Sequence, residues 1–181
     1  MSISSDTRIR MNSNPDAIYS VYVYPDGTEH WVDAYYNGLH RVNGKPAVKC
    51  ANGTKEWYRY GKLHRNGDFP AIIKINGTKK WYKSGKLHRN FKPAIKKQNG
   101  TKKWYQNGEL GCLFGPAIIK HNGTKKWYQN GELHREIGPA IIKHNGTEKW
   151  YCHGCFIKEK HVSPRFKLDD QIDPSNDDKT T

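Results

Sequence analysis

The sequence has few aliphatic residues and no long apolar run. Its hydrophobic fraction is 35%, against roughly 45–50% in average globular proteins. No apolar stretch approaches the roughly 20 residues that span a bilayer, and no apolar leader core follows the first residues. These absences predict an intracellular, cytoplasmic protein without a transmembrane segment.

Cysteine and acidic residues are also scarce. The four cysteines are too few and too irregularly placed for a disulfide framework in 181 residues, which agrees with a reducing compartment. Lys and Arg total 31 against 17 Asp and Glu, so the formal net charge is +14. Residues 26–161 carry +16 and residues 162–181 carry −2. A surface this positive attracts polyanions, whether nucleic acid, anionic lipid or acidic protein.

Aromatic residues, in contrast, are abundant and regularly spaced. The six Trp and eleven Tyr exclude a typical disordered chain. An internal repeat is marked by Asn-Gly-Thr-x-x-Trp-Tyr, which begins at Asn52, Asn76, Asn99, Asn122 and Asn145, with a looser copy from Asp26. Successive tryptophans are 26, 24, 23, 23 and 23 residues apart. About three quarters of the chain is therefore one unit copied six times.

Each unit predicts a β-hairpin. Asn-Gly between two β-prone runs favours a type I′ turn, because both residues tolerate positive φ. In the best-preserved unit the arms are residues 140–144 and 147–151. The fold class is therefore all-β: an elongated, single-layer antiparallel β-hairpin repeat solenoid of six units of about 23 residues. Its Trp side chains serve as core, rather than as a platform for nucleic-acid bases.

The domain prediction follows the repeat. We expect an N-terminal capping strand in residues 1–25, six β-hairpin repeats in residues 26–161 and a disordered acidic tail in residues 162–181. The cap would cover the open edge of the first hairpin, as terminal repeats require.

The unit resembles a known family. Its Trp-Tyr-x-Asn-Gly-Lys/Glu-Leu core is similar to the MORN (membrane occupation and recognition nexus) repeat, in the W-Y-x-N-G-K-L-H-R-x-x-G-P-A variant of bacteria, phages and large viruses. The fit is good in residues 81–94 and 127–140, and an insertion interrupts it in the first unit. The resemblance implies a scaffolding, protein-binding or membrane-associating role and no cofactor.

A His-Arg pair recurs at one place in the units and predicts a row along one edge. The row has two interpretations: each His bonds a neighbouring turn, or the pairs form an anion-binding edge. Because one pair repeats instead of different groups converging on one point, the row does not predict catalysis. The pairs are His40-Arg41, His64-Arg65, His88-Arg89 and His134-Arg135.

Lysines follow the turn threonine in three units and predict a basic stripe. The stripe is either a soluble face that blocks sheet-to-sheet association or a contact for polyanions. Its residues are Lys79, Lys80, Lys102, Lys103, Lys125 and Lys126.

The fourth unit departs from the pattern. Where other units have Leu-His-Arg, it has Leu110-Gly-Cys-Leu-Phe114. An apolar patch of Cys112, Leu113 and Phe114 on a charged surface predicts a partner or homodimer contact, with sequence drift as the alternative.

The last repeat contains a C-x-x-C sequence. Cys152 and Cys155, with His161 downstream, form a weak candidate for zinc. No second C-x-x-C accompanies them, so a terminal cap with free thiols is favoured and no metal or cofactor is assigned.

These observations predict a non-enzymatic binding or scaffold protein, since no nucleotide loop, nucleophile triad or carboxylate pair is present. The first hypothesis is a protein partner engaged through a basic solenoid surface, as for a viral or phage factor acting on a host component. The alternatives are sequence-independent nucleic-acid binding through the Lys stripe and His-Arg edge, and peripheral binding to anionic membrane.

Overall fold

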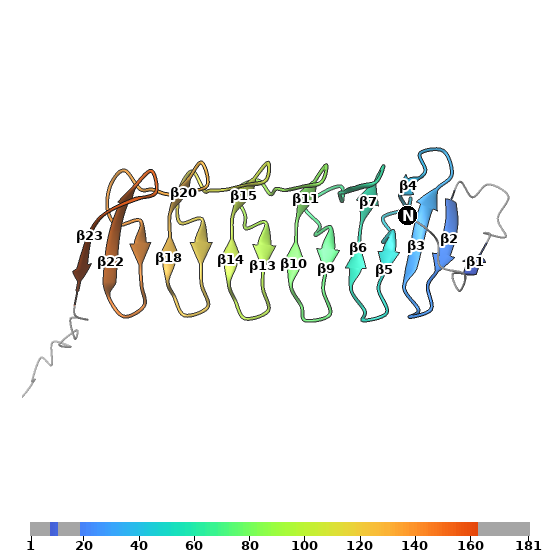
Figure 1. The fold of residues 1–181 in the computed structure, drawn as a ribbon, viewed down its shortest axis with the longest axis horizontal. Coiled ribbons are helices and arrows are strands. Elements are labelled where there is room, and N and C mark those ends of the chain that lie inside the picture. Colours follow the sequence, from blue (N-terminus) through green and yellow to red (C-terminus); the bar gives the residue numbers. More distant parts are fainter. Residues whose placement is uncertain (1–7, 11–18, 163–181) are drawn as a thin grey trace, which may run out of the picture.

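The chain forms one long antiparallel sheet of short strands (Figure 1). The computed structural model describes residues 8–10 and 19–162. In spatial order the main strands are β1 (Arg8–Arg10), β2 (Tyr19–Val23), β3 (Glu29–Asp33), β5 (Val48–Lys49), β6 (Lys55–Glu56), β9 (Ile72–Ile73), β10 (Lys79–Lys80), β13 (Ile95–Lys96), β14 (Lys102–Lys103), β17 (Ile118–Ile119), β18 (Lys125–Lys126), β21 (Ile141–Ile142), β22 (Thr147–Cys152) and β23 (Cys155–His161). β4 (Gly38–Leu39) pairs with β3. The predicted all-β hairpin solenoid is confirmed as a single long antiparallel sheet with a repeat of about 23 residues.

A row of four smaller hairpins lies along one side of this sheet (Figure 1). These upper hairpins are β7 (Tyr58–Arg59) with β8 (Lys62–Leu63), β11 (Tyr82–Lys83) with β12 (Lys86–Leu87), β15 (Tyr105–Gln106) with β16 (Glu109–Leu110), and β19 (Tyr128–Gln129) with β20 (Glu132–Leu133). In the middle of the array each unit therefore contains two hairpins, one in the main sheet and one above it.

The two kinds of hairpin use different turns. The type I′ turn that the sequence predicts for the main-sheet hairpins is wrong. In the main sheet, Gly123 has φ +81° while Asn122 keeps negative φ. The Gly123 N–H donates to the Lys120 carbonyl, and the Thr124 N–H donates to Asn122 Oδ1 at 3.2 Å. This is a three-residue loop, a type I turn followed by a left-handed glycine.

The type I′ turn occurs in the upper hairpins instead. Asn130 and Gly131, between β19 and β20, both have positive φ, 50° and 80°. Tyr60 and Ser84 take the same conformation at the equivalent place. A two-residue I′ loop suits the right-handed twist of the strands that it joins, so these positions accept a non-glycine residue with positive φ.

The core is a ladder of small and aromatic side chains repeated in each unit. Five alanines are completely buried, together with the first apolar residue of the following strand and the turn threonine. The Trp31, Trp57 and Trp81 rings are also buried. In five units the backbone N–H of the Trp donates to the alanine carbonyl of the next hairpin, as in Trp81 to Ala94 at 2.8 Å. The alanines are Ala47, Ala71, Ala94, Ala117 and Ala140.

The ends of the array are built from longer strands. β2 pairs with β3 across the Tyr24–Thr28 turn. Residues 19–23 thus form the first arm of the first hairpin, and β1 pairs with their free edge. The predicted capping segment otherwise lies outside the described residues, as does the predicted tail beyond Val162. Within the described ranges, no helix has the length and apolar character to cross a bilayer.

Candidate functional site

The histidines of the His-Arg pairs connect successive upper hairpins. Each Nδ1 accepts a hydrogen bond from a backbone N–H in the turn of the next unit, at 3.1–3.3 Å. His64 and His88 also bond an asparagine of their own loop through Nε2, at 2.9 Å. The pairs are His40 with Tyr60, His64 with Ser84, His88 with Asn107 and His134 with His153. This geometry is the one expected for a structural histidine row.

The arginines of the same pairs lie against the core. In four units the guanidinium carbon sits 3.8–4.0 Å from the centre of a Trp ring. Arg65 illustrates the arrangement: it stacks on Trp57, and its Nη1 donates to the Pro70 carbonyl at 3.2 Å. Burial lowers the pKa of Arg65. Because these guanidinium groups already have partners, anion binding at the predicted His-Arg edge stays a prediction.

The fourth unit lacks both residues and with them several inter-unit bonds. Gly111 stands in place of the histidine and Cys112 in place of the arginine. Elsewhere the turn glycine donates to the preceding unit's leucine carbonyl, as in Gly108 to Leu87 at 2.9 Å. In the described part of the chain no such bond joins Gly131 to Leu110. The fourth and fifth upper hairpins are therefore less tightly tied together than their neighbours.

An exposed apolar row runs through this part of the molecule. Phe91, Phe114 and Ile137 each lie two residues before a unit's proline and are 81%, 86% and 86% exposed. Leu113 adds a fourth side chain at 77%. The sequence pattern singled out Leu113 and Phe114 but missed Phe91 and Ile137. Their shared offset from the proline is the signal that could have found them.

Two cavities open beside this apolar row. One, of about 250 Å³, is lined by Phe91, Trp104, Cys112, Phe114 and Pro116, among others. The other, of about 560 Å³, shares the Gly111–Gly115 segment and extends to the fifth unit, where Arg135, Glu136 and Ile137 line it. The predicted partner contact at Cys112, Leu113 and Phe114 thus lies between two concave regions.

The six lysines of the predicted basic stripe form two rows on opposite faces of the sheet. Lys80 pairs with Ile72 and Lys79 with Ile73, and successive strand residues point to opposite faces. Lys79, Lys102 and Lys125 are exposed, whereas Lys80, Lys103 and Lys126 are half-buried among isoleucines. This division follows from the pleat, because adjacent residues of a strand point to opposite faces.

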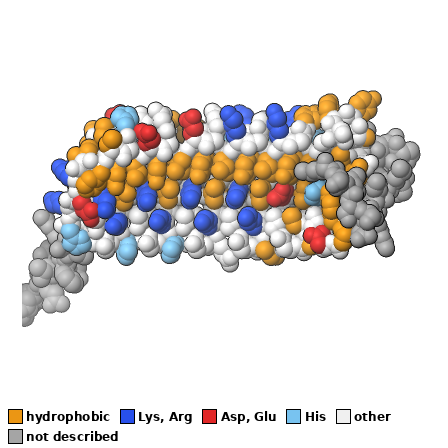
Figure 2. Space-filling model, viewed as in Figure 1, with side chains coloured by type: hydrophobic (Ala, Val, Ile, Leu, Met, Phe, Trp, Pro, Cys, Tyr) orange, Lys and Arg blue, Asp and Glu red, His pale blue; other side chains and the backbone are white. Residues whose placement is uncertain are grey.

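The half-buried row lies close to a further row of lysines, each directly after the first arm of a main-sheet hairpin: Lys74, Lys97, Lys120 and Lys143. Figure 2 shows basic side chains in two lines beneath a continuous apolar band. Desolvation lowers the pKa of Lys126, and the charges of Lys120, Lys143 and Lys103 lower it further. Desolvation and the charges of nearby lysines also lower the pKa of Lys80, although Glu56 acts in the opposite direction. This face therefore holds mutually repelling positive charges.

Charge also changes sign along the upper hairpins. The first residue of the second arm is Lys62 and Lys86 in two units, then Glu109 and Glu132 in the next two, all exposed. Figure 2 shows this upper edge passing from basic to acidic side chains. The apolar row and its cavities lie at the acidic end.

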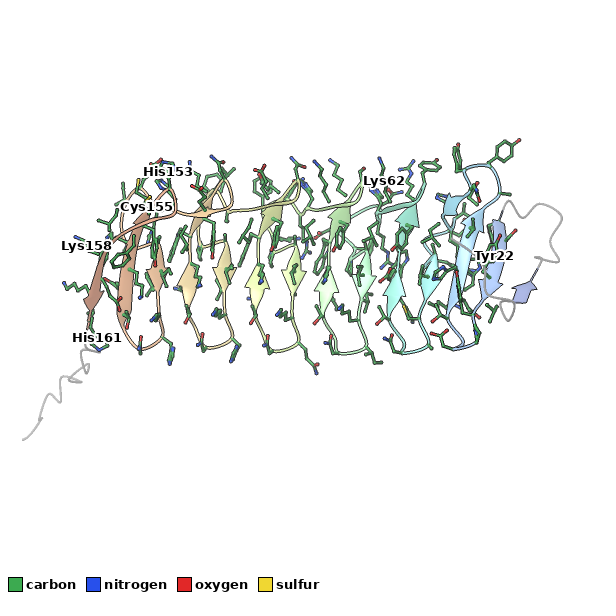
Figure 3. The ribbon with its side chains drawn as sticks, in the orientation of Figure 1. Tyr22, Lys62, His153, Cys155, Lys158 and His161 are labelled. Carbon is green, nitrogen blue, oxygen red and sulfur yellow. The ribbon has the colours of Figure 1, made fainter. Side chains whose placement is uncertain are left out.

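The three residues of the predicted zinc candidate, Cys152, Cys155 and His161, do not lie together. Cys152 and Cys155 face each other across the His153-Gly154 turn. His161 pairs with Thr147 at the other end of β23, six extended residues or about 20 Å from Cys155. Figure 3 shows Cys155 and His161 at opposite ends of this strand.

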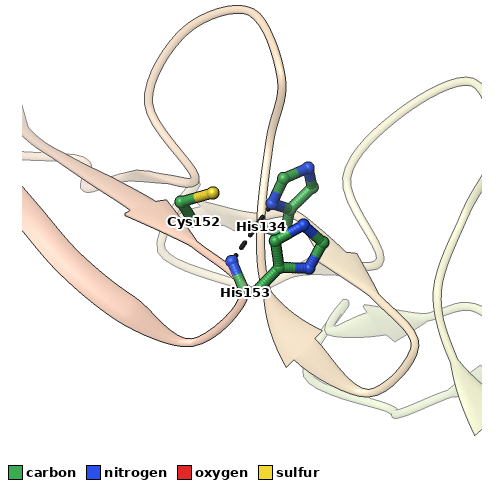
Figure 4. A group of neighbouring side chains, drawn as sticks. All are labelled: His134, Cys152 and His153. Carbon is green, nitrogen blue, oxygen red and sulfur yellow. Dashed lines mark hydrogen bonds between the residues drawn. The ribbon is translucent and has the colours of Figure 1, made fainter.

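A different group gathers near the same turn (Figure 4). The ligand atoms of His134, Cys152 and His153 lie within 4.8 Å of one another. His134 Nδ1, however, accepts the His153 backbone N–H at 3.2 Å, the inter-unit bond that the other histidines make. The neutral ring then carries its proton on Nε2, so His134 could ligate a metal only by giving up that bond. The group is better explained as part of the histidine row.

Comparisons with known proteins do not show a function for this chain. No protein-family model matches the sequence, and no curated protein sequence matches it. Among solved structures, the chain has a weak likeness to the wild-type TCP10 domain of Danio rerio CPAP in complex with a peptide of Danio rerio STIL, with a TM-score of 0.21 and 13% identity. The alignment covers 86% of this chain and 99% of that chain. A likeness of this size carries no argument.

Proposed function

We propose that the chain is a non-enzymatic binding protein that engages a protein partner at the exposed apolar row. The observation that carries this is the exposure of Phe91, Leu113, Phe114 and Ile137 beside two cavities. Contiguous apolar side chains on a polar surface are typical of recognition sites. Aromatic anchors beside concave regions are also typical of the residues that dominate binding energy.

The repeat architecture supports the same proposal. A solenoid presents equivalent positions at regular intervals, about 10 Å apart when each unit adds two strands. Three successive units place an apolar residue at the same offset from proline, so an extended segment of a partner can meet them in turn. The Trp-Tyr-x-Asn-Gly core and the 23-residue period support assignment to the MORN-type repeats, among which a binding or scaffolding role is expected.

The experiment is selection of peptides from a random displayed library on the immobilised full chain. Affinities of the selected peptides are then measured for two double variants. The site variant is Leu113→Ser with Phe114→Ser. The matched control is Tyr35→Ser with Ile75→Ser, which removes two other exposed apolar side chains, 87% and 73% exposed.

The proposal predicts that selected peptides bind wild type and control alike and the site variant at least about tenfold more weakly, because the anchors carry most of the binding energy. Failure to enrich any peptide, or equal binding to both variants, would contradict it. Circular dichroism of the variants distinguishes lost binding from lost structure.

A second candidate function, sequence-independent nucleic-acid binding, is supported by the half-buried lysine row. Burial, and after it the charges of neighbouring lysines, lower the pKa of Lys80 and Lys126. A polyanion placed there would relieve the repulsion between the lysines. The two lysine rows provide a matched test, since each contributes three charges on one face of the sheet.

The prediction for this second candidate compares two triple variants in titrations with mixed-sequence single- and double-stranded nucleic acid. Changing the half-buried row to Gln should weaken binding more than changing the exposed row to Gln. The half-buried row is Lys80, Lys103 and Lys126, and the exposed row is Lys79, Lys102 and Lys125. Equal losses would instead indicate non-specific attraction by net charge. Wild-type binding that disappears by about 150 mM salt would remove this candidate function.

Peripheral binding to anionic membrane and the predicted viral or phage origin have no separate structural support, and they stay predictions from the sequence.

A further inference from the structure

Four units form a binding site for a guanidinium group, which their own arginine occupies. The guanidinium stacks on the Trp ring at 3.8–4.0 Å, and its Nη1 donates to the carbonyl of the following proline at 3.2–3.3 Å. We call the Trp face and the proline carbonyl together the guanidinium seat. The arginines that occupy it are Arg41, Arg65, Arg89 and Arg135.

The fourth unit has the seat without the arginine. Trp104 and Pro116 are in their usual places, and the backbone frame is the same: Trp104 N–H donates to the Ala117 carbonyl at 2.8 Å, and Gly111 N–H donates to the Trp104 carbonyl at 3.2 Å. Cys112 stands at the arginine position. Its side chain ends one atom beyond Cβ and cannot supply a guanidinium.

Trp104 is half-buried, as is Trp127 beneath Arg135, whereas Trp31, Trp57 and Trp81 are buried. The accessibility of Trp104 is shown by the cavity that it lines and, among the described residues, by the lack of a cation over its ring. In the part of the chain that the structure describes, no Lys or Arg side chain stacks over Trp104. Both Trp104 and Pro116 line the cavity of about 250 Å³.

We propose that this fourth seat binds the guanidinium group of an arginine carried by the partner protein. The inference rests on the proposed function and names the chemistry of the partner segment. The four intramolecular arginines show which group the seat fits: a planar cation that can stack on an indole and donate to a carbonyl. A lysine ammonium has the charge without the planar fork, so it fits less well.

The surroundings favour a cation flanked by apolar residues. Phe91, Leu113 and Phe114 form the rim, and the adjoining cavity is lined by Glu109 and Glu136. The cationic groups that line the two cavities already have partners. Arg89 stacks on Trp81 and makes two hydrogen bonds to Asp68, at 2.6 and 2.9 Å, and Arg135 stacks on Trp127.

The test uses a small probe, acetyl-Phe-Arg-Phe-amide, with the citrulline peptide as its uncharged isostere. Binding to the full chain is followed through the assigned indole N–H resonances of the six tryptophans. The expected result is a saturable shift of the Trp104 resonance, with the Arg peptide bound at least about tenfold more tightly than the citrulline peptide. A lysine peptide is expected to fall between them.

Two variants decide whether the seat is responsible. Cys112→Arg places an arginine of the chain itself in the seat and should abolish the preference for the Arg peptide, whereas Cys112→Ser leaves the seat open and should bind as wild type does. If Cys112→Arg fails to fold, Trp104→Leu, which removes the ring, replaces it as the decisive variant. Equal binding of Arg and citrulline peptides to wild type, or unchanged Arg preference in the seat-filling or ring-free variant, would overturn the proposal.

The outcome is separable from that of the proposed function. Library peptides that depend on Leu113 and Phe114 but contain no arginine would overturn the guanidinium inference and leave the protein-binding role standing. If the Arg peptide shifts the Trp104 resonance but the chain selects no peptide from the library, the result would support the seat and count against the protein-binding role.

Discussion

At the scale of single residues, the arginine that four units share joins the core to the loop before the next hairpin. Arg65 contacts the Trp57 ring and the Pro70 carbonyl, and Arg89 and Arg135 repeat the pattern with their own Trp and Pro. The sheet is poor in aliphatic residues, so a stacked guanidinium with its methylene stem supplies packing that Leu or Ile would supply elsewhere.

The first stability prediction concerns this contact. Arg65→Ala should lower the free energy of unfolding by about 1–3 kcal/mol, because it removes a partly desolvated cation–π stack and a hydrogen bond. Lys83→Ala, at an exposed strand position, is the control and should change the free energy of unfolding by less than about 0.5 kcal/mol. Urea denaturation measures both; equal effects would show that the stack contributes nothing.

The same scale shows where residue-level prediction from sequence succeeds and where it stops. The recurrence of His-Arg predicts a row, and its geometry matches the option in which each His bonds a neighbouring turn. The stacking of Arg on Trp does not follow from spacing, since the two residues of a unit are eight to ten positions apart and meet only after the upper hairpin folds back.

At the scale of the element, Asn-Gly pairs recur in two chemically different turns. After the first arm of a unit the Asn side chain bonds the Thr N–H, and the glycine alone takes positive φ. In the upper hairpins both turn residues have positive φ. The Asn-Gly pattern predicted the main-sheet hairpins but not the upper hairpins. It also gave the main-sheet turns the wrong type, because Asn-Gly is compatible with both turns and the number of loop residues decides between them.

A second prediction tests the main-sheet turn. Gly123→Ala should destabilise by about 1–2 kcal/mol, since φ is +81° and no neighbouring atom lies within 4 Å of an added Cβ. The cost is then purely conformational. Gly115→Ala also meets no atom within 4 Å and has no positive φ, so it should be neutral or slightly stabilising. Thermal unfolding of the two variants provides the comparison, and equal destabilisation would contradict the turn assignment.

At the scale of the whole molecule, repetition converts local features into extended surfaces. The lysine pairs become two rows on opposite faces of the sheet, and the residues before proline become the apolar row. The period and the hairpin pattern predicted the long sheet correctly. The division of the lysines between faces follows from strand alternation in the sequence. The cavities require the side chains of adjacent units, so they could not be obtained from the repeat alone.

The two surfaces should respond differently to salt. Nucleic-acid binding through about 6–10 phosphates weakens by a factor of 10³ to 10⁵ between about 50 and 200 mM salt. Binding at the apolar row depends mainly on burial of Phe and Leu side chains, which salt in this range affects little.

The central claim, that a protein partner binds at the apolar row, is tested most directly by the affinity of a library-selected peptide at about 50 and 200 mM salt. Wild type, the Leu113→Ser/Phe114→Ser variant and the Tyr35→Ser/Ile75→Ser control are compared. The account predicts a salt effect below about tenfold and a loss of at least about tenfold in the Leu113/Phe114 variant alone. An affinity that falls about a thousandfold with salt and is the same in all three proteins would contradict it.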